Sequence, residues 1–327
     1  LAHSAKNGYP SQSYFDHVYN TMKRALIFAR EMKRYCRKDA KQIENILCLA
    51  ALYHDLGKLA EENQKELHKE GIKSGHLPVN HVDAGAAFLK QKGQEALCSL
   101  ILVYAHHQGL PDFTVEENRA EMVCYRDTRE SVRACFDREM EQLLQIHRQL
   151  IPESNVHNPE YCEGDMSMFI RMVFSCLVDA DHSDTAAAYG QYPEHDNIPK
   201  LKPALRLEAL NRYVANLGEK NRSKRNDLRT QMYERCRDGQ REEGIVSNDG
   251  AVGSGKTTAV MAYQLNQAVA KGARRIFVVL PYTNVITQSV EVYRNALVLP
   301  GEEREAVVAE LHCKADFEDE DTRCLTS

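Results

Sequence analysis

Long apolar runs are missing from this 327-residue sequence. No segment approaches the ~20 apolar residues that a membrane-spanning helix needs, and no signal peptide opens the chain. We therefore expect no membrane partner. Ten cysteines are present, but no two of them form a Cys-x-x-Cys pair. This spacing argues against a zinc ribbon and is typical of a cytoplasmic protein with reduced thiols.

The sequence also lacks a strong excess of one charge. A net charge of −5, with 43% hydrophobic and 27% charged residues, is ordinary for a globular protein and gives no chain-wide sign of nucleic-acid binding. Between Lys200 and Arg241, however, Lys and Arg outnumber Asp and Glu about two to one. The densest basic group is Lys220, Arg222, Lys224 and Arg225. This region fits either a solvated helix face or linker, or a surface that contacts phosphates.

Internal repeats and low-complexity segments are absent, and the chain is long enough for two domains. Residues 1–190 carry helical periodicity or mixed apolar runs without the alternation of strands. Helices are predicted at Tyr14–Arg34, Asp39–Tyr53, Asn80–Gln91, Gln94–His107, Val115–Gln149 and Met166–Tyr189. A group of prolines, Pro193, Pro199 and Pro203, marks a boundary before another helical stretch.

After Gly244 the pattern changes. A short apolar piece, Ile245-Val246, precedes a glycine loop, and a helix is predicted at Gly255–Lys271. Arg275–Leu280 is typical of a buried parallel strand. The order of strand, loop, helix and strand predicts the opening of an α/β nucleotide-binding domain.

Histidine and aspartate stand where apolar helices of the first half end. His54 and Asp55 follow the run Ile43–Tyr53, and His106 and His107 end the helix built on Leu97–Val103. Because an unpaired carboxylate in an apolar run is costly, the aspartates that follow Phe174 need partners, and a cation is the natural one. Two further histidines, at the start of predicted helices, complete the set. The candidates are His17, His54, Asp55, His81, His106, His107, Asp179 and Asp181.

Imidazole nitrogen and carboxylate oxygen together suit Mn, Fe, Co, Ni or Zn better than calcium. A carboxylate that bridges two metals ~4 Å apart would clamp a phosphodiester and activate water. We expect Asp55 to be that carboxylate, and Lys58, three residues later, to neutralise charge on the phosphoryl oxygens. The remaining histidines are assigned to helix caps or the surface, as single histidines usually are. They are His3, His68, His76, His147, His157, His182, His195 and His312.

Residues 1–190 resemble the HD superfamily of metal-dependent phosphohydrolases through His54-Asp55. They resemble more narrowly the HD nuclease domain of the CRISPR-associated helicase–nuclease of type I systems. That family has an early histidine, a His-Asp-x-Gly-Lys block, a helix-start histidine, a His-His pair and a late aspartate after alanine. The matching residues here are His17, His54, Asp55, Lys58, His81, His106, His107 and Asp181. The resemblance implies one or two divalent transition metals and cleavage of single-stranded DNA.

Three of these assignments stay open. His3 competes with His17 as the early histidine, and His76 competes with His81. Asp179 either replaces Asp181 or supports it through a hydrogen bond.

The glycine loop satisfies the P-loop pattern in full, as Gly250-Ala-Val-Gly-Ser-Gly255-Lys256-Thr257. Gly253 and Gly255 let backbone N–H groups converge on phosphates, Lys256 reaches the β and γ oxygens, and Thr257 coordinates Mg²⁺. The following helix offers its positive N-terminal end to the same anion. The pattern therefore predicts binding of ATP and Mg²⁺.

The segment Leu280–Gln288 resembles the nucleic-acid-contacting motif of superfamily 2 helicases, and Leu228–Gln231 resembles their adenine-sensing region or belongs to an ordinary amphipathic helix. Ala251-Val252 depart from the Pro-Thr that is common in this loop. An acidic Asp-Glu-x-His motif, a second motor domain and an arginine finger are all missing. The chain starts at Leu1 rather than Met and stops at Ser327 in an acidic stretch. We therefore expect a fragment of a longer protein, which binds nucleotide weakly.

The predicted fold class is multi-domain: an all-α HD domain followed by the first part of an α/β RecA-like helicase domain. The predicted boundaries are 1–195 for the nuclease, 196–243 for a basic helical connector and 244–327 for the truncated motor. The resemblance implies a metal-dependent DNA nuclease, coupled in the longer protein to ATP-driven 3′-to-5′ unwinding and recruited by an RNA-guided surveillance complex of the Cascade type. The alternatives are a nucleotide phosphohydrolase or cyclic-nucleotide phosphodiesterase with an accessory P-loop, and a metal-stabilised binding module without turnover.

Overall fold

A computed structural model describes residues 1–6, 8–36, 38–69, 77–152, 167–191, 199–220, 223–239 and 244–312. These residues are mostly helical, and they form no strand beyond two isolated bridges near the N-terminus, His3 with Gln12 and Lys6 with Tyr9. The chain divides between Pro193 and Glu194 into two compact units. No helix among the described residues is both long enough and apolar enough to cross a membrane.

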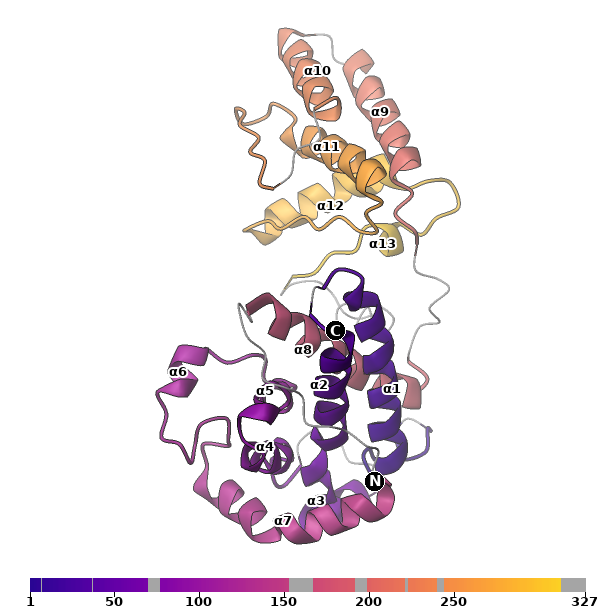
Figure 1. Cartoon of the computed structure of the whole chain (residues 1–327). Coiled ribbons are helices and arrows are strands. Elements are labelled where there is room, and N and C mark those ends of the chain that lie inside the picture. The colour runs from indigo at the N-terminus through magenta and orange to yellow at the C-terminus, as the bar shows by residue number, and fades with distance from the viewer. Residues whose placement is uncertain are drawn as a thin grey trace. The chain divides into compact units, whose positions relative to one another are not determined.

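The first unit is a bundle of helices whose bounds follow the predicted periodicity closely in most places (Figure 1). Its elements are α1 (Tyr14–Lys33), α2 (Ala40–Tyr53), the 3-10 helix η1 (Leu56–Leu59), α3 (Glu61–Leu67), α4 (Val82–Gln91), the 3-10 helix η2 (Gln94–Ala96), α5 (Leu97–Ala105), α6 (Phe113–Glu117), α7 (Glu130–Leu150) and α8 (Ser167–Ala188).

The core of this unit lies where α1, α2, α5 and α8 pack together. Helix α1 begins at a Ser13 cap, whose side chain accepts a hydrogen bond from the backbone of Asp16, and Asp39 caps α2 in the same way. Ile46 and Leu47 of α2 and Leu177 of α8 are fully buried. Each such side chain stabilises the fold by about 1.5–3 kcal/mol, which holds the ends of these helices in fixed relative positions.

Two glycines bring η1 and α4 close to their neighbours. A Cβ atom on Gly57 would overlap the backbone of His81, and one on Gly85 would overlap the carbonyl oxygen of Tyr53. The start of α4 therefore lies directly against the turn that follows α2. Helix α7 packs against both α4 and η1 and covers this side of the bundle.

The prediction of one helix over Val115–Gln149 is wrong. Helix α6 ends at Glu117, residues 118–129 are irregular, and α7 begins only at Glu130. The buried carboxylate of Glu116 accepts a hydrogen bond from the backbone of Tyr125, at 2.6 Å, and Tyr125 has a positive φ of 54°. Arg126 reaches the buried Asp83 of α4. These two hydrogen bonds, of which the one between Arg126 and Asp83 joins residues far apart in sequence, override the local helical preference.

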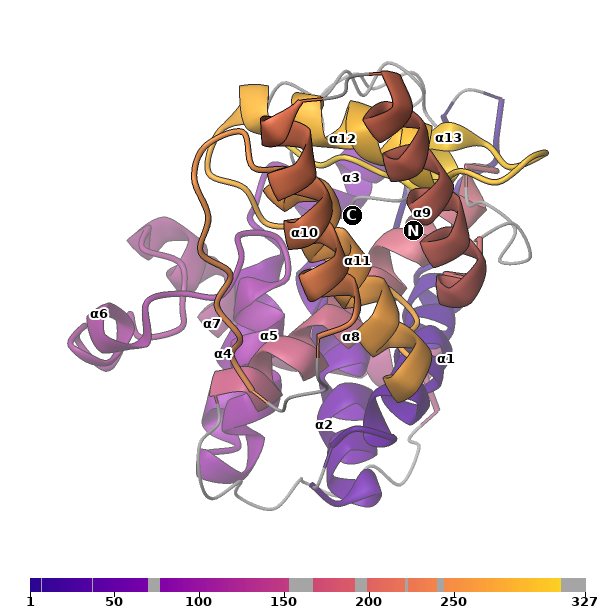
Figure 2. The ribbon, with the colours of Figure 1, turned by 90° about the horizontal axis from the view of Figure 1, so that it is seen from above.

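The second unit is also helical in its described part. Its helices are α9 (Pro203–Lys220), α10 (Lys224–Arg237), α11 (Lys256–Lys271), α12 (Thr283–Leu297) and α13 (Arg304–Val307). Helix α11 packs against α9 and α10, and α12 packs against α9 (Figure 2). Leu210, Leu265 and Tyr293 are buried in their common core. Arg206 is buried as well and donates hydrogen bonds to Glu302, one of them at 2.8 Å.

The predicted strand at Arg275–Leu280 is not formed. These residues are irregular, and the side chains of Phe277 and Val279 are exposed, as is that of Ile245 before the loop. A strand is stable only when neighbouring strands take up its backbone hydrogen bonds, and no residue in the described part of this unit supplies such a neighbour. A RecA-like α/β domain is therefore not shown here.

Candidate metal centre

The candidate site lies inside the first unit, where the ends of α2 and α5, the start of α4 and the buried faces of α1 and α8 meet. Seven of the eight ligand candidates of the sequence, all except Asp179, belong to this cluster. They fall into groups whose ligand atoms lie within 4.8 Å of one another: His17, His54 and Asp181; Asp55, His81, His106 and His107; and His3, His17 and Asp55. Asp55 belongs to two of the three groups.

Two helix-end histidines are oriented by the helices they terminate. The Nδ1–H of His54 donates to the carbonyl of Ala51 at 2.8 Å, and that of His106 donates to the carbonyl of Val103 at 2.6 Å. Each bond fixes the tautomer, so Nε2 carries the lone pair and faces the cluster. This is the orientation that a metal-binding imidazole needs.

The two carboxylate oxygens of Asp55 face opposite sides of the cluster. Oδ2 lies 3.1 Å from Nε2 of His17 and 3.5 Å from Nε2 of His54. Oδ1 lies 3.2 Å from Nε2 of His81 and 4.0 Å from Nε2 of His106. One carboxylate therefore adjoins both histidine groups, which is the arrangement of a bridging ligand.

Lys58 belongs to the same buried cluster. Because η1 is a 3-10 helix, residues three apart lie on one side, and Nζ of Lys58 is 2.7 Å from Oδ2 of Asp55. The predicted juxtaposition of these two residues is present, although the element is a 3-10 turn rather than a continued α-helix. The ammonium is in place to compensate negative charge at the centre.

The protonation preferences differ across the cluster. Burial disfavours the charged form of His17, but hydrogen bonds to Asp181, Asp184 and Asp55 raise its pKa to about 10. Burial opposes ionisation of Asp55, yet Lys58 and the histidines hold its pKa well below the usual range. His17 therefore carries a proton in the interior, surrounded by carboxylates, at a place that suits a cation.

The other side of the cluster holds neutral imidazoles. Burial lowers the pKa of His107 to about 4, with repulsion from His81 as a second cause. Burial also lowers the pKa of His106 and of His81. Nε2 of His107 lies 3.0 Å from Nε2 of His81. Neutral imidazole is the ligating form, so three ligands at neutral pH require no deprotonation.

Three buried atoms at the centre have no hydrogen bond of good geometry in the described structure: Nε2 of His106 and the two carboxylate oxygens of Asp55, which have only the close charged contacts with Lys58 and the histidines given above. Buried polar atoms are almost always satisfied, and these three point into one cluster of nitrogen and oxygen donors. The residues thus fit one or two divalent metals, with Asp55 between two histidine groups.

The open assignments resolve unevenly. His3 and His17 both belong to the cluster, so neither excludes the other as the early histidine. Nε2 of His3 lies 3.5 Å from Nζ of Lys58 and 3.3 Å from the hydroxyl of Thr185. Asp181 faces the cluster, with Oδ1 3.2 Å from Nε2 of His17, whereas Asp179 is in none of the three groups. His76 lies outside the described residues.

The sequence reasoning missed Asp184 and misplaced His147. Oδ2 of the buried Asp184 accepts a hydrogen bond from Nδ1 of His17 at 2.9 Å. The sequence feature that could have identified Asp184 is its position about one helical turn after Asp181. His147 is not a surface residue: it is buried, and its Nδ1 accepts a hydrogen bond from the hydroxyl of Tyr14 at 3.0 Å.

The glycine loop of the second unit lies directly before α11. Gly253 and Gly255 have φ values of 78° and 85°, a backbone that favours glycine, and α11 begins at Lys256. The Lys256 ammonium folds back onto the carbonyls of Gly250 and Ala251. Arg229 of α10 donates to the carbonyl of Gly253 at 2.8 Å. Thr257 follows in the first turn of α11.

Comparison with known proteins identifies one domain. Residues 14–140 match the family described as HD domain, and this range includes all the ligand candidates except His3, Asp179 and Asp181. No curated protein matches the chain. The chain therefore contains an HD domain, which implies a metal-dependent hydrolase, and its histidine and aspartate cluster could hold the metal.

Proposed function

We propose that the first unit is a metal-dependent phosphodiesterase that cuts single-stranded DNA, and that Asp55 would serve as a ligand shared by two divalent transition metals. The observation that carries this proposal is the placement of Asp55, whose two buried oxygens lie beside two different histidine groups. His17, His54 and Asp181 would hold one metal. His81, His106 and His107 would hold the other.

When bound, two such metals polarise the phosphodiester and supply an activated water at neutral pH. The residues of the chain prepare that step. Ala51 and Val103 fix the tautomers of His54 and His106. Asp184 holds His17, and the buried Lys58 ammonium stabilises negative charge that develops on the phosphoryl oxygens. The buried walls around Asp55 exclude bulk water, which strengthens each of these interactions.

The choice of DNA as substrate, and the link to an ATP-driven helicase of CRISPR type I systems, rest on sequence resemblance. They are supported by the spacing of the HD residues and by the complete P-loop, in which Gly253, Gly255, Lys256 and Thr257 would hold ATP and Mg²⁺. Recruitment by an RNA-guided surveillance complex and a cytoplasmic location belong to the same proposal.

The test uses circular single-stranded DNA, which has no ends, with Mn²⁺, Ni²⁺ or Co²⁺. We expect metal-dependent linearisation, followed by degradation, that is lost with EDTA and in Asp55→Ala. Asp55→Ala should keep most of its affinity for DNA, measured by filter binding. Robust cutting by Asp55→Ala would contradict the metal assignment. Release of phosphate or triphosphate from free nucleotides, without cutting of DNA, would instead favour a nucleotide phosphohydrolase.

A further inference from the structure

A separate pocket lies in the first unit, and several of its lining residues are next in sequence to ligand candidates of the cluster. It has a volume of about 170 Å³ and is formed by residues from the start of α4, the end of α5 and the irregular segment before α7. Its lining residues include Asn80 and Val82, which flank His81, and Gln108, which follows His107. The pocket is therefore lined by the chain neighbours of His81 and His107, two histidines whose Nε2 atoms lie 3.0 Å apart.

One wall of the pocket is held rigidly by paired charges. Arg126 donates two hydrogen bonds of 2.8 Å to the carboxylate of the buried Asp83 and a third, of 2.9 Å, to Asp137. Arg129 is paired with Asp127 at 2.8 Å, and Asp127 also accepts from Asn80. Each cation in this wall already has a carboxylate partner, so the wall offers little to a phosphate.

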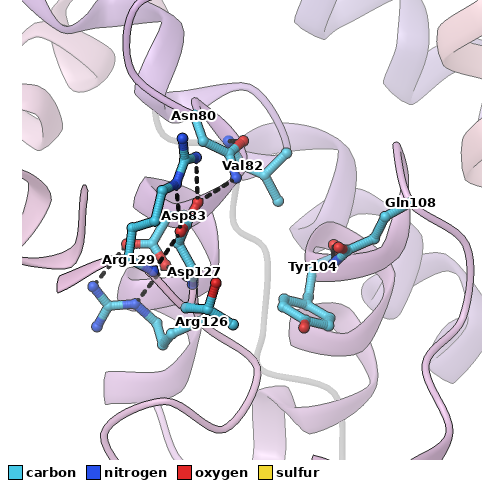
Figure 3. Close-up of a pocket in the computed structure, with 9 residues that line it drawn as sticks. Asn80, Val82, Asp83, Tyr104, Gln108, Arg126, Asp127 and Arg129 are labelled. Atoms are coloured by element: carbon cyan, nitrogen blue, oxygen red, sulfur yellow. Dashed lines mark hydrogen bonds and ion pairs between the residues drawn. The ribbon is translucent and has the colours of Figure 1, made fainter. Parts of the chain in front are cut away.

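The opposite wall consists of Tyr104 and Gln108, which face the charged network across the pocket (Figure 3). The Tyr104 hydroxyl is engaged with Glu116 and Arg119, and the largely buried Tyr104 side chain forms part of the wall. Gln108 donates from Nε2 to the carbonyl of Tyr104 at 2.9 Å. Within the part of the chain that the structure describes, no group donates to Oε1 of Gln108.

The groups left for a ligand are therefore neutral: an aromatic ring, an amide oxygen and the exposed hydroxyl of Thr128. We propose that this pocket receives a nucleobase of the substrate, next to the phosphodiester held at the metal centre. A planar, uncharged ring with hydrogen-bonding edges matches these walls, and the volume admits a single base. In a nucleic acid the base is separated from its phosphate only by the sugar, which fits a pocket lined by Asn80, Val82 and Gln108, the chain neighbours of His81 and His107.

This inference rests on the proposed phosphodiesterase activity, and its test separates the two. The full chain is assayed with Mn²⁺ on two chromogenic diesters, thymidine 5′-(p-nitrophenyl phosphate), which carries a base, and bis(p-nitrophenyl) phosphate, which does not. The parent protein should prefer the thymidine ester in kcat/KM. In Gln108→Ala that preference should fall about threefold to tenfold, the loss of one hydrogen bond, and Thr128→Val should lower it in the same direction.

Gln145→Ala, an exposed glutamine of α7, is the matched control and should keep the preference of the parent. An equal kcat/KM for both esters in the parent, or an unchanged preference in Gln108→Ala, would overturn the inference. If the parent hydrolysed neither ester, the proposed function would fail instead. Equilibrium dialysis of thymidine 5′-monophosphate would then test whether the pocket binds a base. Weaker binding by Gln108→Ala than by the parent would support the inference, and no binding by the parent would reject it.

Discussion

Nζ of Lys58 lies 2.7 Å from Oδ2 of Asp55, with both side chains almost fully buried. A buried carboxylate at the centre of this histidine and aspartate cluster would be costly to keep charged without a metal. The ammonium compensates part of this charge within the chain itself. Lys58 therefore has two tasks, one in the metal-free protein and one during the proposed cleavage.

Lys58→Met should destabilise the metal-free protein by about 3 kcal/mol, because removal of one partner leaves a buried charge uncompensated. A bound divalent metal replaces the lost cation, so the loss should be smaller with saturating Mn²⁺. Urea unfolding with EDTA and with Mn²⁺ measures both values. Lys65→Met, which breaks an exposed pair with Glu61, should change neither midpoint appreciably. An equal loss in both conditions would contradict this role of Lys58.

Asp184→Asn should weaken metal binding about 10- to 100-fold, the usual effect of removing the carboxylate that orients a ligating histidine. Titration calorimetry with Mn²⁺ measures the affinity, and circular dichroism checks the fold. Asp179→Asn is the matched control on the same helix and should bind metal as the parent does. If the two variants bound metal equally well, Asp184 would not orient His17.

The preference for Asp181 and Asp184 over Asp179 follows from helix geometry. Successive residues are rotated by ~100°, so residues 181 and 184 share a face of α8, whereas residue 179 points elsewhere. The sequence limited the late aspartate ligand to Asp179 or Asp181. Only the packing of α8 against α1 shows which face of α8 is buried. His54 and Asp55 were easier to identify as ligand candidates from the sequence, because both lie directly at the end of a strongly apolar helix.

Other errors of the sequence reasoning have a common physical cause. Residues 118–129 are irregular because Tyr125 and Arg126 make hydrogen bonds to Glu116 and Asp83, and the bond between Arg126 and Asp83 joins residues far apart in sequence. The apolar segment Arg275–Leu280 has the composition of a strand, yet composition supplies no neighbouring strand. Local patterns therefore placed most helices of the first unit correctly and failed where a long-range partner decides the outcome.

Because of His147, the free energy of unfolding of the first unit should fall as the pH is lowered from neutral to mildly acidic. Burial, with repulsion from Arg148, lowers its pKa to about 4, whereas an unfolded histidine has a pKa of about 6.5. The folded state thus holds His147 neutral. Above pH ~6.5 His147 is neutral in the unfolded chain as well, so it does not lower the free energy of unfolding there. Below that pH the unfolded chain binds a proton that the folded chain does not, so stability falls towards pH ~4, by up to about 1.4 kcal/mol per pH unit.

The measurement is urea unfolding across this pH range with EDTA present, which removes the effect of metal binding. His147→Gln should lower stability at neutral pH, because Tyr14 loses its partner, and should flatten the curve between pH ~6.5 and ~4. His68→Gln changes an exposed histidine and should leave the curve parallel to that of the parent. A curve for His147→Gln that runs parallel to the parent would show that His147 does not carry this dependence.

If the glycine loop binds ATP as proposed, Lys256→Ala should abolish that binding, because it removes the ammonium proposed to contact the β and γ phosphates. In the structure its ammonium contacts the loop carbonyls of Gly250 and Ala251, and we expect it to leave them when a phosphate enters. Fluorescence of a labelled ATP analogue measures binding, with Lys271→Ala at the other end of α11 as the control. Metal-dependent cutting of single-stranded DNA should persist in Lys256→Ala, since every ligand candidate belongs to the first unit. Loss of both activities together would mean that the two sites do not act separately.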